Sequence, residues 1–339
     1  MAETVSDLPT RQFGATDMQI TRVGFGAWAI GGGDWAAGWG DQDDNDSVAA
    51  IRHAIDRGIN WIDTAAVYGL GRSEEVVGKA LRQIPAGRQP YVFTKCGLIW
   101  DETNPTAMPR RIGQADSLRR EVENSLRRLG VERIDLYQVH WPAEDGTPIE
   151  SYWQTLLDLK REGKVRAVGL SNHNIAQLTA AEAIGHVDTL QPPFSAIRRG
   201  VGAAELPWCA EHNTGVIVYS PMQSGLLTGT FNTLRAANLP KNDWRSRSPE
   251  FTGEGLSRNL ALAEALRPIA ARHEVSVAAI AVAWTLGWRG VTAAIVGARK
   301  PAQIDNWLGA ASLELTKGDF DEIAAALVRT GAGSGPVHP

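Results

Sequence analysis

Eight short apolar runs alternate with amphipathic segments along this chain, and this alternation restricts its fold more than any other feature. Nearly continuous hydrophobicity is typical of parallel strands that are covered on both faces. Eight strand–helix repeats in succession favour a (β/α)8 barrel over an open sheet. We expect the strands near residues 21–26, 59–63, 91–95, 133–139, 165–170, 187–191, 215–219 and 292–296.

The segments between these runs carry the start and stop signals of helices. The third candidate helix ends in Gly130, a residue type that commonly terminates helices. The apolar segment 275–288 is too short to span a bilayer and predicts a largely buried helix. The clearest helical patterns lie at 43–57, 73–83 and 117–130.

Three segments depart from the repeat. Residues 8–20 are a candidate hairpin before the first barrel strand. Residues 222–257 form a long connection after the seventh strand, and a connection of this length is usually functional or disordered. The tail 331–339 is rich in glycine, lacks a pattern and is predicted to be mobile. We find no domain boundary, so residues 1–339 are expected to form one (β/α)8 barrel domain.

Composition excludes some classes of partner. Apolar residues make up 43% of the 339 residues and charged residues 21%, which is ordinary for a globular protein. The net charge of −4 provides no basic field for nucleic acid or for an anionic membrane. The N-terminus has neither a basic nor an apolar stretch, so no signal peptide is predicted and a cytoplasmic location is expected.

The two cysteines, Cys96 and Cys209, suggest a reducing compartment rather than a disulfide scaffold. Because Cys96 follows Lys95, a reactive thiolate is one interpretation. A buried and inert cysteine at a strand end is the interpretation that we favour. No set of residues is assigned to a metal ion.

Four polar residues stand at or just past the ends of predicted strands: Asp63, Tyr68, Lys95 and His140. In a (β/α)8 barrel these ends meet at one face, which carries the active site. The set matches what carbonyl reduction by a nicotinamide needs. A tyrosine can protonate the developing alkoxide, an ammonium can lower the tyrosine pKa, a carboxylate can hold the ammonium, and a histidine can bind the substrate oxygen.

Each of these residues also has an ordinary explanation when it is taken alone. The aspartate can cap a helix, the tyrosine can pack, the lysine can be solvated, and the histidine can be a satisfied polar residue. Their joint occurrence at the ends of the second, third and fourth strands favours the functional interpretation.

The chain also resembles a known family, the aldo-keto reductases, from about Phe13 to about Ala325. Within the family, the resemblance is to bacterial members grouped with inositol-catabolism and general-stress reductases, and more distantly to potassium-channel β subunits. It implies a (β/α)8 barrel, NAD(P)(H) as cofactor, and catalytic roles for Asp63, Tyr68, Lys95 and His140. The motifs that carry it are VGFGAWAIGG, NWIDTAAVYG, FTKCG, IDLYQVHWP, VRAVGLSN, QPPFSAIRR, YSPMQSGLLTG and IVGARKPAQIDN.

The resemblance further implies a set of cofactor contacts. Tyr219 would stack on the nicotinamide, and its carboxamide would bind Ser171, Asn172 and Gln191. The remaining contacts are implied at Gly26, Ala27, Trp28 and Asp63 after the first two strands, at Ser220, Pro221, Met222, Gln223, Gly225 and Leu226 along the pyrophosphate, and at Gly297, Arg299, Gln303 and Asn306 around the adenosine. Two positions depart from the family pattern, since Phe194 replaces a common tyrosine and Asp305 a frequent glutamate.

Phosphate binding is expected late in the chain. Barrels often bind phosphate through the loops after strands seven and eight, and Arg299 and Lys300 precede a helix that opens with Pro301. Arg299 is a candidate partner of a 2′-phosphate, which favours NADP(H) and leaves NAD(H) possible. The alternative is that both cations are solvated. The string from Gly24 to Ala29 matches a dinucleotide fingerprint, but we reject that interpretation because it leads into a loop and not a helix.

The substrate side is rich in tryptophan, of which the chain has twelve. A pocket for flat or apolar carbonyl compounds is predicted, with Trp35 and Trp39 as candidates to overhang its mouth and ordinary packing as the alternative. The identity of the carbonyl or alcohol substrate and the oligomeric state stay open. The predicted pocket residues are Trp28, Tyr68, Trp100, His140 and Trp141.

The sequence therefore predicts an NADP(H)-dependent reductase of aldehydes or ketones in which Tyr68 is the general acid. One alternative is an NADPH-binding redox sensor or interaction subunit with slow turnover. Another is a barrel lyase or isomerase that uses Lys95 as a Schiff base, which the partnership of Tyr68 and His140 disfavours.

Overall fold

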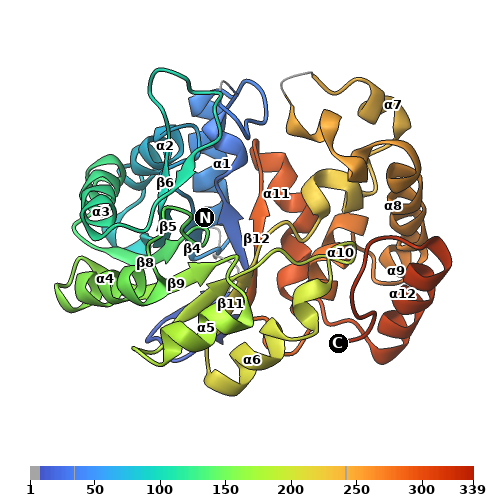
Figure 1. The fold of residues 1–339 in the computed structure, drawn as a ribbon. Coiled ribbons are helices and arrows are strands. Elements are labelled where there is room, and N and C mark those ends of the chain that lie inside the picture. Colours follow the sequence, from blue (N-terminus) through green and yellow to red (C-terminus); the bar gives the residue numbers. More distant parts are fainter. Residues whose placement is uncertain (1–7, 34, 241–242) are drawn as a thin grey trace.

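The computed structural model describes residues 8–33, 35–240 and 243–339, and within them eight parallel strands close into a barrel surrounded by helices (Figure 1). The strands follow one another around the barrel in the order β10-β11-β12-β3-β4-β5-β8-β9. The predicted (β/α)8 architecture is confirmed. The barrel strands are β3 (Val23–Gly26), β4 (Trp61–Asp63), β5 (Tyr91–Cys96), β8 (Ile134–Val139), β9 (Val165–Ser171), β10 (Thr189–Gln191), β11 (Gly215–Val218) and β12 (Ala293–Gly297).

The helices begin and end close to the predicted signals. Asp43 caps the first helix by accepting hydrogen bonds from the backbone N–H groups of Asn45 and Asp46. Gly130 ends the third helix with a left-handed φ of 70°. The helices are α1 (Asp44–Asp56), α2 (Arg72–Leu81), α3 (Ala115–Leu129), α4 (Ile149–Arg161), α5 (Ile175–Glu182), α6 (Glu205–His212), α7 (Thr233–Ala237), α8 (Gly253–Ala265), α9 (Arg267–Arg272), α10 (Val277–Leu286), α11 (Pro301–Leu308) and α12 (Lys317–Thr330).

The barrel interior has its own apolar cluster, which lies below the polar strand ends. Trp61 and Phe93 belong to it, and each lies two residues before Asp63 and Lys95 respectively, on the same face of its strand. The hairpin of β1 (Thr10–Gln12) and β2 (Gln19–Thr21) contributes Phe13, whose ring lies 5.7 Å from that of Phe93. The predicted N-terminal hairpin therefore closes the end of the barrel opposite the polar residues.

Gly24 shows why the dinucleotide-like string occurs where it does. A Cβ at this position would lie 2.1 Å from the indole of Trp61, so only glycine fits beside that ring in the barrel. The string then leads into a single 3-10 turn, Ala29–Gly31, rather than an α-helix. Barrel packing explains this glycine without a dinucleotide fold.

The long connection after β11 is built from short helical turns. It contains α7 and the 3-10 segments η4 (Gln223–Thr228), η5 (Trp244–Arg247) and η6 (Pro249–Phe251). The rings of Phe231 and Phe251 lie 5.5 Å apart within it. The connection thus packs into the main apolar core on the side of the barrel where α8 lies (Figure 1).

The prediction of a mobile tail at 331–339 differs from the structure, which docks this segment against residues 195–202. The buried guanidinium of Arg199 donates to the carbonyl of Ala332 at 3.1 Å and to that of Gly335 at 3.3 Å. A Cβ on Gly333 would lie 1.7 Å from the carbonyl oxygen of Ile197. The glycines here permit close backbone contact, which a segment without a periodic pattern does not reveal in its sequence.

Among the described residues, no single helix has the length and apolar character to cross a membrane. Only the segments Gly253–Arg272 and Val277–Leu286 pass that test together, across a bend of 91°. Every residue of α10 is buried, as predicted for the segment 275–288. Both cysteines are buried as well, and burial raises the pKa of each thiol.

Candidate active site

Lys95 connects the predicted polar residues. From inside the barrel its Nζ donates to Asp63 Oδ1 at 2.6 Å, to the carbonyl of Thr64 at 2.9 Å and to the hydroxyl of Tyr68 at 3.3 Å. The pairing of β4 with β5 fixes this arrangement, because Asp63 lies opposite Phe93 and Lys95 follows two residues later on the same face. An ammonium is therefore held between a carboxylate and a phenol.

Burial dominates the electrostatics of this group. It raises the pKa of Asp63 and lowers that of Lys95, while the attraction between the two opposes both changes. Burial also raises the pKa of Tyr68 well above its ordinary value, and the charge of Asp63 adds to this. We expected the ammonium to lower this pKa, but in the structure burial outweighs it. The phenol of Tyr68 is consequently protonated at neutral pH.

His140 completes the group from the end of β8. Its backbone N–H donates to the carbonyl of Cys96 at 3.0 Å, and its ring centroid lies 5.6 Å from that of Tyr68. Burial, followed by the positive charges of Lys95 and Arg111, lowers the pKa of His140 well below its ordinary value. The imidazole is therefore neutral and retains one N–H donor.

The ends of β9, β10 and β11 supply a row of amide and hydroxyl groups beside Asp63. Gln191 Nε2 donates to Asp63 Oδ2 at 2.9 Å. Asn172 Nδ2 donates to the carbonyl of His140 at 3.0 Å, and the Tyr219 hydroxyl donates to Asn172 Oδ1 at 2.8 Å. These contacts link the catalytic candidates to the residues predicted to hold the nicotinamide.

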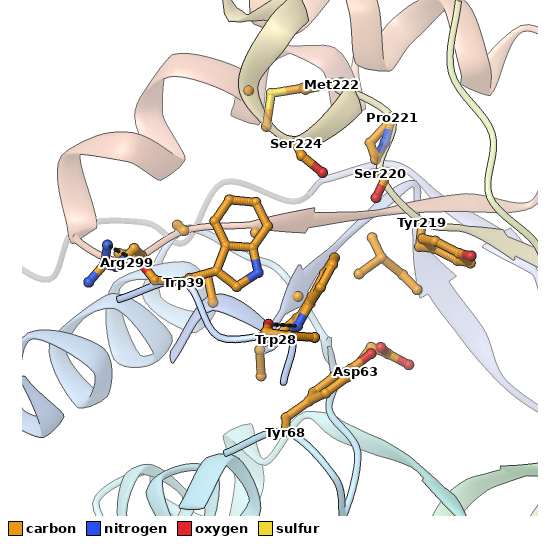
Figure 2. Close-up of a pocket in the computed structure, with 18 of the residues that line it drawn as sticks. Trp28, Trp39, Asp63, Tyr68, Tyr219, Ser220, Pro221, Met222, Ser224 and Arg299 are labelled. Atoms are coloured by element: carbon orange, nitrogen blue, oxygen red, sulfur yellow. Dashed lines mark hydrogen bonds between the residues drawn. The ribbon is translucent and has the colours of Figure 1, made fainter. Parts of the chain in front are cut away.

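A cavity of about 630 Å³ lies above this group and extends towards the start of α11 (Figure 2). Most of the predicted cofactor and substrate residues line it, together with Trp35 and Trp39. These residues are Gly26, Ala27, Trp28, Asp63, Tyr68, His140, Trp141, Asn172, Gln191, Tyr219, Ser220, Pro221, Met222, Gly225, Gly297, Arg299, Gln303 and Asn306.

Lys95 lies below the cavity without lining it, and four of the predicted cofactor and substrate residues do not line it either. The Gln223 amide is engaged elsewhere, since it accepts from Ser195 Oγ and donates to Glu250, both at 2.7 Å. Leu226 is fully buried in the outer core. Ser171 donates to the carbonyl of Gln191 at 2.8 Å, and Trp100 packs beside the cavity against a small apolar cluster. These side chains lie behind the cavity wall in this structure, and their direct contact with cofactor or substrate stays a prediction.

The backbone after β11 turns sharply against the cavity. Ser220, Gln223, Ser224 and Gly225 all have positive φ angles, between 45° and 105°. Turns of this kind present backbone N–H groups to anions, and the Arg245 guanidinium lies close by with Nη1 bonded to the Ser224 carbonyl at 3.1 Å. The N–H groups of Gln223 and Gly225 already donate to Ser220 and Met222, and Arg245 is paired with Asp243 at 2.6 Å, so this turn is a candidate position for a pyrophosphate and not a set of free donors.

Arg299 has a second role that the sequence did not indicate. Its guanidinium donates to Gln42 Oε1 at 2.5 Å and to the carbonyl of Trp39 at 3.3 Å, and it also contacts the carbonyl of Asp41. It thereby ties the loop before α1 to the start of α11. Asp305, one of the two departures from the family pattern, faces away from the cavity and pairs with Arg57 at 2.5 Å.

Three tryptophan rings connect the loop after β3 to the connection after β11, and two of them, Trp28 and Trp39, line the cavity. The Trp28 ring stacks on that of Trp244 at 6.0 Å, and Trp39 meets both edge-on at 5.2 Å and 6.1 Å. The Arg245 guanidinium lies 4.6 Å above the Trp39 ring. Figure 2 shows Trp28 and Trp39 between Arg299 and Tyr219. Trp244 and Arg245 were not among the predicted site residues, because they lie in a connection without periodicity.

The closed barrel, the buried pair of Asp63 and Lys95 and the cavity above it place the candidate site at the face where (β/α)8 barrel enzymes carry their active sites. A family model described as the aldo/keto reductase family matches residues 22–328. The chain belongs to this family.

The relatives that we found extend over nearly the whole chain. The chain is 35% identical to the aldo-keto reductase YhdN of Bacillus subtilis (strain 168) over 325 residues, which cover 96% of this chain and 94% of YhdN. It is 34% identical to the NADH-specific methylglyoxal reductase of Escherichia coli (strain K12), with 93% of this chain and 98% of that protein covered. The solved glycerol dehydrogenase AKR11B4 of Gluconobacter oxydans is 38% identical and superposes with a TM-score of 0.87, covering 97% of this chain and 98% of that one.

Proposed function

We propose that this aldo-keto reductase reduces aldehydes or ketones to alcohols with NADP(H), and that Tyr68 donates the proton. The observation that carries the proposal is the position of Lys95 Nζ, 2.6 Å from Asp63 and 3.3 Å from the Tyr68 hydroxyl, directly below the cavity. When bound, the nicotinamide supplies hydride to the carbonyl carbon.

The residues of the site have distinct tasks in this proposal. Tyr68 gives its proton to the substrate oxygen, and the ammonium of Lys95 stabilises the phenolate that results. Asp63 holds that ammonium in place through the hydrogen bond at 2.6 Å. Neutral His140 directs its N–H towards the substrate oxygen, so that the carbonyl is oriented and polarised.

The cofactor is held along the cavity in the same proposal. Tyr219 packs against the nicotinamide, and Asn172 and Gln191 bind its carboxamide, while the turn at 220–225 receives the pyrophosphate. Arg299 and Arg245 line the far end of the cavity. Asp243 pairs with Arg245 at 2.6 Å, so Arg299 is the cation that favours a 2′-phosphate. The relatives include a reductase named NADH-specific and one named for NADP(+), so NAD(H) is the alternative that the assay must distinguish.

Tyr68→Phe tests the proton donor. Turnover with simple aldehydes should fall by roughly 10²–10⁴-fold, because general acid catalysis typically contributes that much. The assay follows the oxidation of NADPH and, separately, of NADH by absorbance with a panel of carbonyl compounds. NADPH binding, measured by fluorescence, should be nearly the same in the variant and the original protein. Turnover of the variant at the original rate would refute the assignment.

The alternatives make different predictions in the same experiment. Tight NADPH binding without appreciable turnover of any carbonyl would favour a redox sensor or interaction subunit. Trapping of a substrate on Lys95 by borohydride would favour a lyase or isomerase. The hydrogen bonds of Lys95 Nζ to Asp63 and to the Thr64 carbonyl argue against that outcome, because they engage the amine that would have to attack the substrate.

A further inference from the structure

A small flap places a positive charge beside the reacting end of the cavity. The flap consists of β6 (Leu98–Ile99) and β7 (Arg110–Arg111), which pair antiparallel with Leu98 opposite Arg111. Its base is fixed to the barrel, since the backbone N–H of Ile112 donates to the carbonyl of Gly97 at 3.0 Å. Leu98 follows Lys95 by three residues, so Arg111 is held close to the catalytic candidates.

Arg111 differs from the other arginines that line the cavity. Arg235 and Arg245 come from the connection after β11, and Arg299 comes from the loop before α11, so these three belong to the end proposed for the phosphates. Arg111 lines the part formed by the flap, and its charge is among the causes that lower the pKa of His140. A cation therefore lies within electrostatic reach of the position proposed for the carbonyl.

The Arg111 side chain is held in place but can still bind an anion. Its Cζ lies 4.7 Å from the ring of Trp141, and Nη1 contacts Glu144 Oε1. Both partners of this ion pair reach solvent, with 33% and 65% of their side chains exposed. Exposed pairs contribute only about 0–1 kcal/mol, so an incoming carboxylate can compete with Glu144. A guanidinium has five N–H donors in a planar fork, and a carboxylate matches this shape.

The walls around Arg111 are apolar. Leu98, Pro109, Trp141 and Met108 line this part of the cavity, and Met108 is unusually exposed for a large apolar residue, at 77%. An exposed apolar side chain at the mouth of a pocket suits contact with the body of a small ligand. The surroundings thus combine one cation with apolar and aromatic surface.

We propose that this end of the cavity selects carbonyl substrates that carry a carboxylate, which Arg111 binds while their apolar body packs against Trp141 and Met108. Arg111 is then a specificity-determining residue of the carbonyl reduction proposed above, and the inference rests on that function. Glu144 weakens this selection, because its carboxylate competes with that of the substrate for the Arg111 guanidinium.

Matched pairs of substrates test this proposal. The ortho, meta and para isomers of formylbenzoate are compared with their methyl esters, which carry the same aldehyde without the charge. For at least one isomer, kcat/KM should be about tenfold higher for the acid than for the ester, as expected for one charge-assisted hydrogen bond. The ester serves as the reference for any loss that affects all substrates.

Two variants should change this acid-to-ester ratio in opposite directions. Arg111→Gln should lower the ratio about tenfold, and Glu144→Gln should raise it, because the competing carboxylate is removed. Arg111→Lys should give an intermediate value, since it retains the charge but loses the planar fork. Equal ratios in the original protein and Arg111→Gln, or no acid preferred over its ester, would overturn the inference even if every ester is reduced.

A binding measurement separates this inference from the proposed function. Quenching of tryptophan fluorescence is titrated with the ortho, meta and para isomers of (hydroxymethyl)benzoate, the products of the three acids, and for at least one isomer it should require about tenfold more ligand in Arg111→Gln. If neither acid nor ester is reduced, the proposed function fails, and this titration still decides the role of Arg111. Equal affinities would then overturn it. The exposed Glu144→Gln variant provides the second test if Arg111→Gln does not fold.

Discussion

At the scale of single residues, the buried pair of Asp63 and Lys95 makes the site sensitive to the loss of either charge. Their side chains are 3% and 0% exposed, so each depends on the other for compensation. Asp63→Asn should lower the free energy of unfolding by about 3–5 kcal/mol, because it leaves a buried ammonium without its carboxylate. Urea denaturation measures this change.

Asp305→Asn provides the matched control for that prediction. Like Asp63, Asp305 pairs with a cation, in this case Arg57, but the Asp305 side chain is 43% exposed. The loss should therefore be no more than about 1 kcal/mol. Similar effects of the two substitutions would show that burial of the Asp63 pair has little energetic importance.

Titration of His140 should cause no break in the pH profile of kcat/KM near the ordinary pKa of histidine. Burial, Lys95 and Arg111 hold this pKa well below 6.5, so the imidazole is neutral above that pH and gains its proton only at lower pH. We expect no break in kcat/KM attributable to His140 between about pH 6 and 8. His140→Asn should lower the rate without changing the shape of the profile in this range. A break near 6.5 that disappears in the variant would contradict the assignment of a neutral imidazole.

At the scale of elements, the tryptophans connect the loop after β3 to the connection after β11. Trp39 contacts both Trp28 and Trp244 and lies beneath the Arg245 guanidinium. Trp39→Ala should raise the rate of NADPH release by roughly tenfold, since each aromatic or cation–π contact contributes about 0.5–1.5 kcal/mol. Displacement kinetics followed by NADPH fluorescence measure this rate.

Trp208→Ala is the control for this experiment. Trp208 lies in α6 and stacks on His212 with ring centroids 3.9 Å apart, outside the residues that line the cavity. Its loss removes a comparable aromatic contact without affecting either loop. An increase in the release rate that is equal in both variants would argue against a closing role for Trp39.

The sequence predicted the strands better than it predicted the loops. The eight barrel strands were found because buried parallel strands leave continuous apolar runs, and their ends correctly predicted where Asp63, Lys95 and His140 meet. Loops have no such periodicity, so side-chain direction was not predictable there. The positions of Gln223 and Leu226 along the pyrophosphate are implied only by the family resemblance, and in the structure one bonds to Glu250 and the other is fully buried.

At the scale of the whole molecule, the C-terminal segment packs against a part of the chain that lies far from it in sequence. Gly333 has a φ of +61°, and its missing side chain leaves room for the carbonyl of Ile197. Gly333→Ala should lower the free energy of unfolding by about 1–3 kcal/mol, because the new methyl group clashes with backbone and the conformation is unfavourable.

Gly87→Ala is a suitable comparison, because a Cβ at Gly87 would meet nothing within 4 Å. Its effect should stay within about 0.5 kcal/mol. Both changes are measured by chemical denaturation of the full chain. A neutral Gly333→Ala would show that the segment does not depend on this contact, and the mobile tail expected from its composition would then be the better description.

The docked C-terminus also limits where this protein can be linked to a solid surface or to another molecule. Next to its contacts at Ile197 and Arg199 lies Ser195, which bonds to Gln223 at 2.7 Å, and Gln223 belongs to the turn beside the cavity. Anchoring the molecule to a surface through its last residues would therefore pull on a segment that borders the binding cavity. An immobilised catalyst or a sensor built from this chain is better linked through α3, on the far side of the barrel (Figure 1).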